Sequence, residues 1–203
     1  MKINYDLELE KIIKENAGTR PKVLLHSCCG PCSSACIERL KPYFDITIFY
    51  FNPNIEPEEE YIKRKEEQKR LLKELGGVDF LDCDWENDLF VEMSTGLENL
   101  PEGGYRCHKC YDQRMKKTAI VAKENSFDYF GTTLTVSPYK NSQVINCIGK
   151  EISEEVGIKY LFSDFKKREG YKRSIELSKQ YNLYRQDYCG CIYSKRKENL
   201  SEE

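Results

Sequence analysis

The fold is decided by the stretch His26-Ser27-Cys28-Cys29-Gly30-Pro31-Cys32, which follows an apolar run at 23–25 and precedes a helix-like segment at 33–40. This order predicts a turn at which a parallel strand leads into its helix. In open α/β sheets, ligands bind at such turns, at the carboxyl ends of the strands. Because packing alone does not explain three thiols crowded into one turn, the stretch is interpreted as half of a cofactor or redox site.

Segments with strand character alternate with segments of helical periodicity on both sides of this turn. Strands are expected at 22–26, 45–51, 78–83, 127–134 and 159–162. Helices are expected at 4–16, 33–40, 57–75, 87–97, 106–123 and 141–156. The alternation predicts an α/β fold with a parallel sheet of about five strands, flanked by helices and followed by a helical C-terminal part.

Length and composition indicate one domain that stays in the cytoplasm. A chain of 203 residues can bury a real core, and a net charge of −2 is typical of a soluble globular protein. No stretch approaches the ~18 apolar residues that span a bilayer, and no segment of signal-peptide type follows Met1. We therefore expect a single α/β domain over residues 1–203 that carries the site and has no membrane partner.

The ten cysteines are informative, because cytosolic chains use cysteines for metal or redox chemistry more often than for structural disulfides. Most of them fall into three clusters, which are Cys28/Cys29/Cys32/Cys36, the C-x-x-C pair Cys107/Cys110 and the C-x-C pair Cys189/Cys191. Cys83 and Cys147 are isolated, and we expect both to be small buried packing residues.

Two cysteine pairs could together supply four metal ligands: Cys28 with Cys29, and Cys107 with Cys110. The C-x-x-C pair is predicted at a helix start, where both thiols share one face and the helix dipole favours the metal-binding thiolate. Four cysteine thiolates commonly hold an iron–sulfur cluster, whereas structural zinc usually takes two C-x2-4-C knuckles. Because the side chains of adjacent cysteines are expected to diverge, iron–sulfur is favoured and zinc is the alternative.

The motif Cys189-Gly190-Cys191 is a second, distinct signal. Two thiols separated by one glycine can close into a small strained ring, and strained, exposed disulfides are typically labile or catalytic. The alternatives are that the two cysteines are further metal ligands or bystanders.

Four other residues near the clusters have less specific interpretations. Cys32 could be a ligand to an additional metal, a thiol donor or a helix packing residue, and Cys36 is expected to be structural. His26 and His108 could donate protons, but hydrogen bonding to the backbone is the simpler interpretation of both.

The segment from Lys166 to Lys197 differs from the rest of the chain, with ten basic residues against three acidic ones. Five tyrosines are interleaved with these charges, at positions 171, 181, 184, 188 and 193. Basic side chains track phosphates and aromatic rings stack on unpaired bases, so the segment could bind RNA. The alternative is a solvated helical face whose tyrosines cover the core.

Four motifs in this order resemble the QueH-type epoxyqueuosine reductases. They are HSCCGPC at 26–32, RCHKCYDQR at 106–114, GTTLTVSPYK at 131–140 and YCGC at 188–191, and the match spans roughly residues 22–194. The resemblance implies a nucleotide-hydrolase-like (HUP) sheet. It also implies reduction of the epoxide of epoxyqueuosine, at the wobble position of a tRNA anticodon, as the last step of queuosine biosynthesis.

The resemblance further implies a cofactor and partners. By position, Cys28, Cys29, Cys107 and Cys110 match the ligands of a [4Fe-4S] cluster, and Cys189 and Cys191 match a redox-active, catalytic pair. Some relatives imply an additional iron ion beside the cluster, where Cys32 could be a further ligand. The partners would be a tRNA that carries epoxyqueuosine in its anticodon and an electron donor protein or small reductant.

Two other classes of function fit parts of the sequence. An ATP-dependent tRNA sulfur-transfer enzyme of the same fold would carry a glycine-serine pyrophosphate loop after the first strand, but residues 27–32 occupy that place. A zinc-stabilised RNA-binding module would explain four thiols and a basic segment without catalysis. A visible absorption spectrum would separate this module from an iron–sulfur enzyme.

Overall fold

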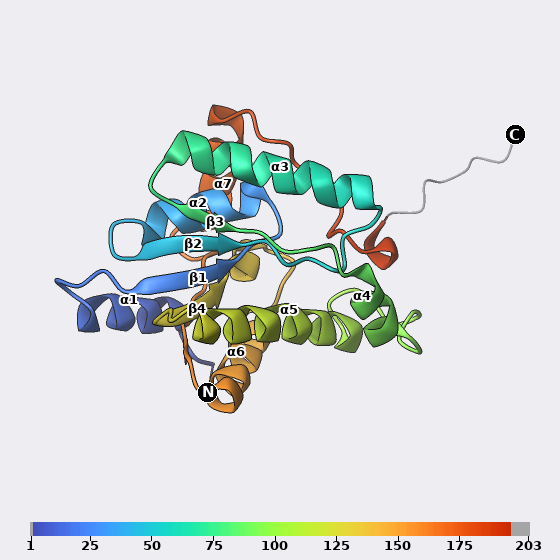
Figure 1. Cartoon of the computed structure of the whole chain (residues 1–203), viewed down its shortest axis with the longest axis horizontal. Coiled ribbons are helices and arrows are strands. Elements are labelled where there is room, and N and C mark those ends of the chain that lie inside the picture. The colour runs from blue at the N-terminus through green and yellow to red at the C-terminus, as the bar shows by residue number, and fades with distance from the viewer. Residues whose placement is uncertain (1, 196–203) are drawn as a thin grey trace, which may run out of the picture.

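A sheet of five parallel strands forms the centre of the computed structural model, which describes residues 2–195 (Figure 1). The strands are β1 (Lys22–His26), β2 (Asp45–Phe49), β3 (Asp79–Leu81), β4 (Tyr129–Thr132) and β5 (Lys159–Tyr160). They lie in the order β3-β2-β1-β4-β5, and all four neighbouring pairs are parallel. The predicted α/β fold with a parallel sheet of about five strands is confirmed.

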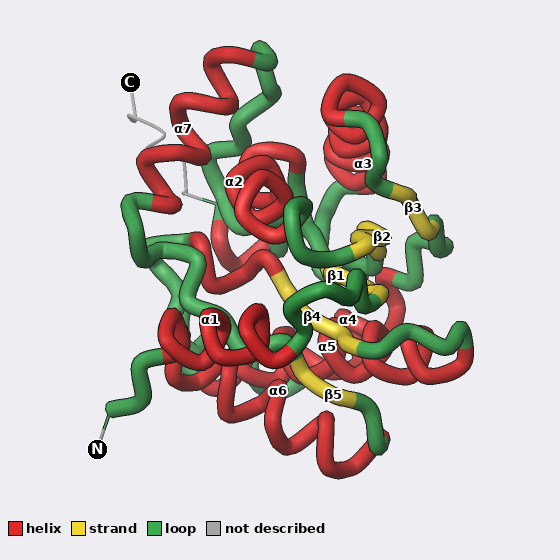
Figure 2. Tube along the Cα trace, turned by 90° about the vertical axis from the view of Figure 1, so that its left-hand side faces the viewer, coloured by secondary structure: helices red, strands yellow, loops and turns green. Residues whose placement is uncertain are grey.

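Helices cover both faces of this sheet. They are α1 (Tyr5–Glu15), α2 (Gly30–Leu40), α3 (Glu58–Leu75), α4 (Asn87–Ser94), α5 (Tyr105–Glu124), α6 (Ser142–Val156) and α7 (Gly170–Gln180). Figure 2 shows α2, α3 and α7 on one side of the sheet and α5 and α6 on the other. The helical C-terminal part is therefore α7, which packs on α2. None of the helices in the described part of the chain is long and apolar enough to cross a membrane.

The two faces of β1 bury separate apolar clusters, because successive side chains of a strand point to opposite sides. Leu24 packs in the cluster beneath α5 and α6, with residues such as Met115 and Ile145. Val23 and Leu25 pack in the cluster beneath α1 and α2. The central strand is thus buried on both sides, which explains its uninterrupted apolar sequence.

The order of the strands reverses at β1, since the chain runs from β1 outward to β3 and then returns to β4 on the other side. In open α/β sheets, the crevice at the carboxyl ends of the strands at such a point is the usual ligand site. The turn after β1 contains Cys28 and Cys29, and the loop after β4 leads to Lys140. The topology therefore brings the cysteine-rich turn to this crevice.

The bounds of several elements differ from the sequence-based expectation, and three of these differences have a clear physical cause. Helix α2 begins at Gly30 rather than at residue 33, because Pro31 suits the first turn of a helix, where no hydrogen-bonding N–H is needed. Strand β4 ends at Thr132, whose hydroxyl accepts a hydrogen bond from the Leu134 N–H (3.2 Å) and starts a 3₁₀ turn at Thr133–Val136. Strand β5 ends at Tyr160, and the Ser163 N–H then binds the side chain of Asn146.

Helix α6 lies very close to β5 because residue 149 is a glycine. A Cβ atom on Gly149 would overlap the ring of Tyr160, which is itself buried against Phe130. We expect Gly149→Ala to lower the free energy of unfolding by ~1–3 kcal/mol through overpacking, although alanine favours a helix by about 1 kcal/mol. Urea denaturation tests this, with Glu154→Ala on the exposed face as the control. A more stable Gly149→Ala variant would contradict the account.

Candidate functional site

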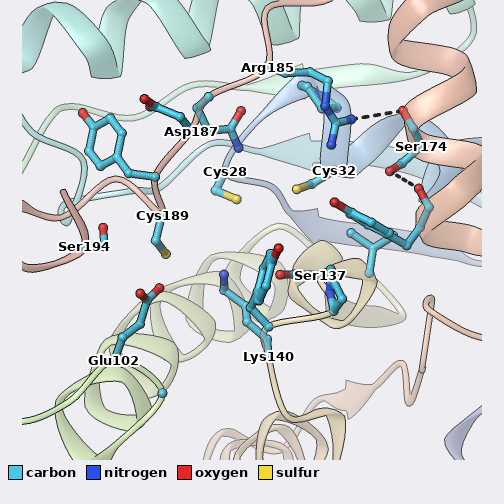
Figure 3. Close-up of a pocket in the computed structure, with 18 residues that line it drawn as sticks. Cys28, Cys32, Glu102, Ser137, Lys140, Ser174, Arg185, Asp187, Cys189 and Ser194 are labelled. Carbon is cyan, nitrogen blue, oxygen red and sulfur yellow. Dashed lines mark hydrogen bonds between the residues drawn. The ribbon is translucent and has the colours of Figure 1, made fainter. Parts of the chain in front are cut away.

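A cavity of about 470 Å³ lies where the turn after β1, the loop after β4 and the C-terminal segment meet. In Figure 3 the sulfur atoms of Cys28, Cys32 and Cys189 point toward the same space, and Lys140 reaches it from the opposite side. Its volume suits a small organic group, since ligand pockets typically measure about 300–1,000 Å³. Two of the three cysteine clusters therefore contribute to one cavity.

Three thiols of the first cluster converge. The Sγ atoms of Cys28, Cys29 and Cys32 all lie within 4.8 Å of one another. The expectation that the adjacent cysteines diverge was wrong, because the chain changes from strand to helix at Cys29 and the alternation of a strand is broken there. A metal–sulfur bond of about 2.3 Å puts two thiolate ligands of one tetrahedral ion about 3.8 Å apart, so this trio could hold a metal ion.

One thiol of this trio has a lowered pKa. Hydrogen bonds from the thiols of Cys29 and Cys32 lower the pKa of Cys28 well below its ordinary value, and the positive charges of Arg114 and Lys140 lower it further, against the effect of burial. The same hydrogen bond raises the pKa of Cys29 to about 12. The side-chain amide of Gln186 also donates to Cys29 Sγ (3.0 Å). Since metals bind the thiolate, this lowering favours the form of Cys28 that a metal would bind.

The C-x-x-C pair lies in the first two turns of α5, as predicted. Cys107 is half-buried, packs against the apolar cluster that contains Cys28 and Cys29, and accepts a hydrogen bond from the Gly103 N–H (3.2 Å). Cys110 is buried, and its burial raises its pKa to about 12. Neither belongs to the group of thiols within 4.8 Å of one another. The expected set of four ligands thus remains a prediction.

The backbone of the C-x-C pair is held in place from α3. The buried guanidinium of Arg64 donates to the carbonyls of Cys189 (3.1 Å) and Tyr188 (3.3 Å). Gly190 has a φ of +131°, and a Cβ atom there would lie 2.9 Å from the side chain of Ile55. Glycine is required between the two cysteines because the backbone conformation and the close approach both exclude a side chain.

The two thiols of the C-x-C pair face different surroundings. Cys189 lines the cavity, whereas Cys191 is buried beside Phe90 and Cys110. All ten cysteines are free thiols in this structure. The pair expected to be redox-active therefore lies next to the pair expected to bind metal, and Cys191 and Cys110 share one apolar cluster.

The isolated cysteines do not behave alike. Cys83 is half-buried, and its thiol donates to the Tyr50 carbonyl (3.1 Å), in keeping with a packing role. Cys147 is exposed, so the expectation that it is buried was wrong. The buried positions of α6 include Ile145 and Gly149, and residue 147 lies across the helix from both. Cys36 is fully buried and donates to a backbone carbonyl of its own helix, as expected of a structural residue.

His26 is buried at the end of β1 with both ring nitrogens occupied. Its Nδ1 lies 3.1 Å from the Thr132 hydroxyl, and its Nε2 lies 3.1 Å from the Phe51 carbonyl and 3.2 Å from the side-chain oxygen of Asn52. Burial, followed by the positive charge of Arg114, lowers the pKa of His26 to about 4. A neutral histidine fixed in this way ties three strand ends together, which is the structural role expected for it.

The basic C-terminal segment uses much of its charge within the protein. Arg168 pairs with Asp6 (3.1 Å) and Arg173 pairs with Glu38 (2.8 Å), so both arginines fasten the segment to the rest of the chain. Its five tyrosines are all half-buried. Both observations favour the alternative of a covering segment for this part, whereas Arg196 and Lys197 lie outside the described residues.

Sequence reasoning missed three side chains of the site. Lys140 and Gln186 line the cavity, and Arg114 is buried one turn after Cys110. Burial opposes protonation of Lys140, but its pKa is raised, because negative charge on neighbouring groups, first of all Cys189, would stabilise the ammonium group. Lys140 and Arg114 are the last residues of two motifs already noted in the sequence, and this position was the sequence signal that could have identified them as site residues. The burial of Arg114 and the position of Lys140 at the cavity could not be read from it.

The fold and the site define a parallel α/β protein with a thiol-rich cavity at the reversal point of its sheet. The family model described as "Epoxyqueuosine reductase QueH" matches residues 23–197. The chain belongs to this family.

Relatives with the same description cover nearly the whole chain. The relative from Staphylococcus epidermidis is 44% identical, with 98% of this chain and 87% of the relative covered. The relative from Streptococcus pyogenes serotype M1 is 43% identical, with 98% of this chain and 81% of the relative covered. The relative from Staphylococcus aureus is 41% identical, with 98% of this chain and 87% of the relative covered. The QueH resemblance noted in the sequence is therefore confirmed.

Proposed function

We propose that this chain reduces the epoxide of epoxyqueuosine in a tRNA anticodon to give queuosine, and that residues 1–203 act as one α/β domain. The observation that carries the proposal is the family match over residues 23–197, within which two of the three cysteine motifs line one cavity. Family membership favours this reductase over a sulfur-transfer enzyme or a zinc-stabilised RNA-binding module.

The thiols of the site fit an iron–sulfur cluster in their chemistry. Cys28, Cys29, Cys107 and Cys110 would be its ligands, and Cys32 would be available to an additional iron ion, since it lies within 4.8 Å of Cys28 and Cys29. A bound cluster would supply the site with electrons one at a time. Zinc has no redox chemistry. A reductase function therefore favours iron over zinc at this site, whereas four thiols alone would suit either metal.

The C-x-C pair can supply the electrons in the number that the reaction requires. Removal of the epoxide oxygen as water takes two electrons and two protons and leaves a carbon–carbon double bond. Closure of Cys189 and Cys191 into a disulfide releases two electrons and two protons. An electron donor protein or a small reductant must then reduce the disulfide again. The cavity position of Cys189 supports this role.

The cavity can hold and polarise the substrate. An unpaired anticodon base reaches an enzyme without a duplex being opened, so little energy is lost in extracting it. Lys140 carries a positive charge into the cavity, where it would stabilise negative charge on the departing oxygen. Tyr139, at the rim, is 84% exposed and offers a face on which a neighbouring base can stack.

The C-terminal segment is expected to bind phosphates through its lysines and arginines. Neutralising Lys195, Arg196 and Lys197 together should weaken tRNA binding and reduce the slope of log K against log salt concentration by up to about 2, if three single-strand phosphate contacts are lost. Neutralising Arg173, which pairs with Glu38, is the matched control and should leave the slope unchanged. An unchanged slope in the triple variant would locate the tRNA surface elsewhere.

Conversion of the nucleoside tests the function itself. The anaerobically purified chain should convert epoxyqueuosine-containing tRNA to queuosine-containing tRNA when a reductant is present, as measured by mass spectrometry of the digested nucleosides. Without the reductant, each chain should convert about one epoxyqueuosine, because its C-x-C pair stores one pair of electrons. No conversion by protein with a full metal complement and added reductant would refute the proposal.

A further inference from the structure

Arg114 is buried without a counter-charge. Its side chain is about 1% exposed and forms no ion pair with any carboxylate in residues 2–195. Two other arginines are equally inaccessible but satisfied: Arg64 pairs with Glu60 (2.6 Å), and Arg106 donates to the carbonyls of residues 97, 98 and 100. Arg114 has one carbonyl acceptor, and its Nη2 is buried with no hydrogen-bond partner.

The position of Arg114 on α5 directs it to the thiols. Residues 107, 110 and 114 are spaced three and four apart, so both C-x-x-C cysteines and Arg114 share one face of the helix. Its Nε donates to the Cys110 carbonyl (3.1 Å). Burial opposes the charge of Arg114, yet its pKa is raised, because Cys110, Cys189 and Cys28, one from each cysteine motif, would each favour that charge when ionised.

An unpaired buried charge is costly, and proteins normally supply a partner for it. Here the described residues supply the guanidinium with one carbonyl acceptor and the ring of Tyr111, 5.7 Å away, neither of which is an acidic partner. Thiols bind metal as thiolates, so the cysteines of the site would lose their protons and become anionic when they bind a metal. The missing counter-charge is therefore the charge that metal–thiolate bonding would create.

We infer that Arg114 is the resident counter-charge of the metal–thiolate site and acts as a positioning residue that favours the reduced state of a metal centre held there. This inference rests on the proposed iron–sulfur function. Reduction would add a negative charge to a metal centre held by these thiols, so a fixed positive charge on the same face of α5 as Cys107 and Cys110 would stabilise the reduced form and raise the reduction potential. Arg114 touches neither substrate nor the electron donor in this role.

The reduction potential gives the first test. Arg114→Met should lower the equilibrium constant for one-electron reduction about tenfold, which corresponds to ~59 mV for a one-electron couple. Arg114→Lys keeps the charge and should retain most of the wild-type value. Lys116→Met removes one charge from the exposed side of the same helix and should leave the potential unchanged. Spectroelectrochemical titration of the iron-loaded chains measures all three.

Thermal unfolding with and without metal gives the second test. In metal-free protein Arg114→Met removes an uncompensated buried cation, so its melting temperature should rise by at least ~2 °C. In iron-loaded protein the same variant should gain less stability from the metal than wild type gains. An ordinary packing residue would instead lower both melting temperatures equally. If Arg114→Met fails to retain iron, restored loading in Arg114→Lys still supports the charge role.

Two outcomes would overturn the inference. One is an unchanged potential in Arg114→Met at full iron content, and the other is a lower melting temperature of this variant in the metal-free protein. Failure of the proposed function has a different signature, because wild-type protein would then hold no iron at all. In that case the metal-free comparison still decides whether Arg114 lacks a counter-charge.

Discussion

Serine in place of any one of Cys28, Cys29, Cys107 or Cys110 is expected to strip most of the iron and lower epoxide reduction at least ~100-fold. Loss of a residue that only orients a metal ligand already costs about 10–100-fold, and these variants remove the ligand itself. A hydroxyl does not replace a thiolate at such a site, because it stays protonated. Iron and sulfide per chain, the visible spectrum and nucleoside conversion are the measurements.

Two controls sharpen this experiment. Cys147 is exposed on α6 and Cys83 bonds the Tyr50 carbonyl, so Cys147→Ser and Cys83→Ser should keep both metal and activity. Cys32→Ser tests the trio within 4.8 Å directly. Full iron in the variants of Cys107 and Cys110, together with lost iron in Cys32→Ser, would show that the metal is held by the first cluster alone.

Cys189→Ser and Cys191→Ser are expected to keep the cluster absorbance and lose multiple turnover. A single remaining thiol cannot close the disulfide that stores two electrons, whereas the four proposed metal ligands are intact. The test is informative because Cys191 shares an apolar cluster with Cys110, so a ligand role is sterically available to it.

Thiol trapping distinguishes the two roles of the C-x-C pair. After one anaerobic turnover without reductant the wild-type pair should be oxidised, and added reductant should restore both thiols. Loss of iron in proportion to activity in both variants would make the pair part of the metal site. Full turnover in both variants would make it a bystander.

The fold could be predicted because its signal is local. The apolar run that ends in His26 and the turn after it have the pattern of a strand that leads into a helix, and repeated alternation of this kind permits few arrangements besides a parallel sheet. Some elements end earlier than predicted because contacts with other residues end them, and these contacts do not appear in the hydrophobic pattern of the element. Strand β4, for example, stops where the Thr132 hydroxyl binds the backbone two residues later.

The site could be predicted in its residue types but not in its geometry. Spacing did not reveal that Cys28 and Cys29 converge, because convergence depends on where the strand stops. The exposure of Cys147 depended on which face of α6 meets the sheet.

Contacts between distant parts of the chain were equally invisible in the sequence. Arg168 is neutralised by Asp6, far away along the chain, so composition overstated the free charge of the C-terminal segment. Arg114, in contrast, has no carboxylate partner among residues 2–195. This property of a motif residue is visible only in the packed structure.

The central claim, that these thiols hold an iron–sulfur centre, is tested most directly by the visible spectrum of the anaerobically purified full chain, combined with iron, sulfide and zinc analysis. The account predicts a brown protein with broad visible absorption that bleaches on reduction, and about four iron and four sulfide per chain. A colourless protein that carries about one zinc and no sulfide would contradict it.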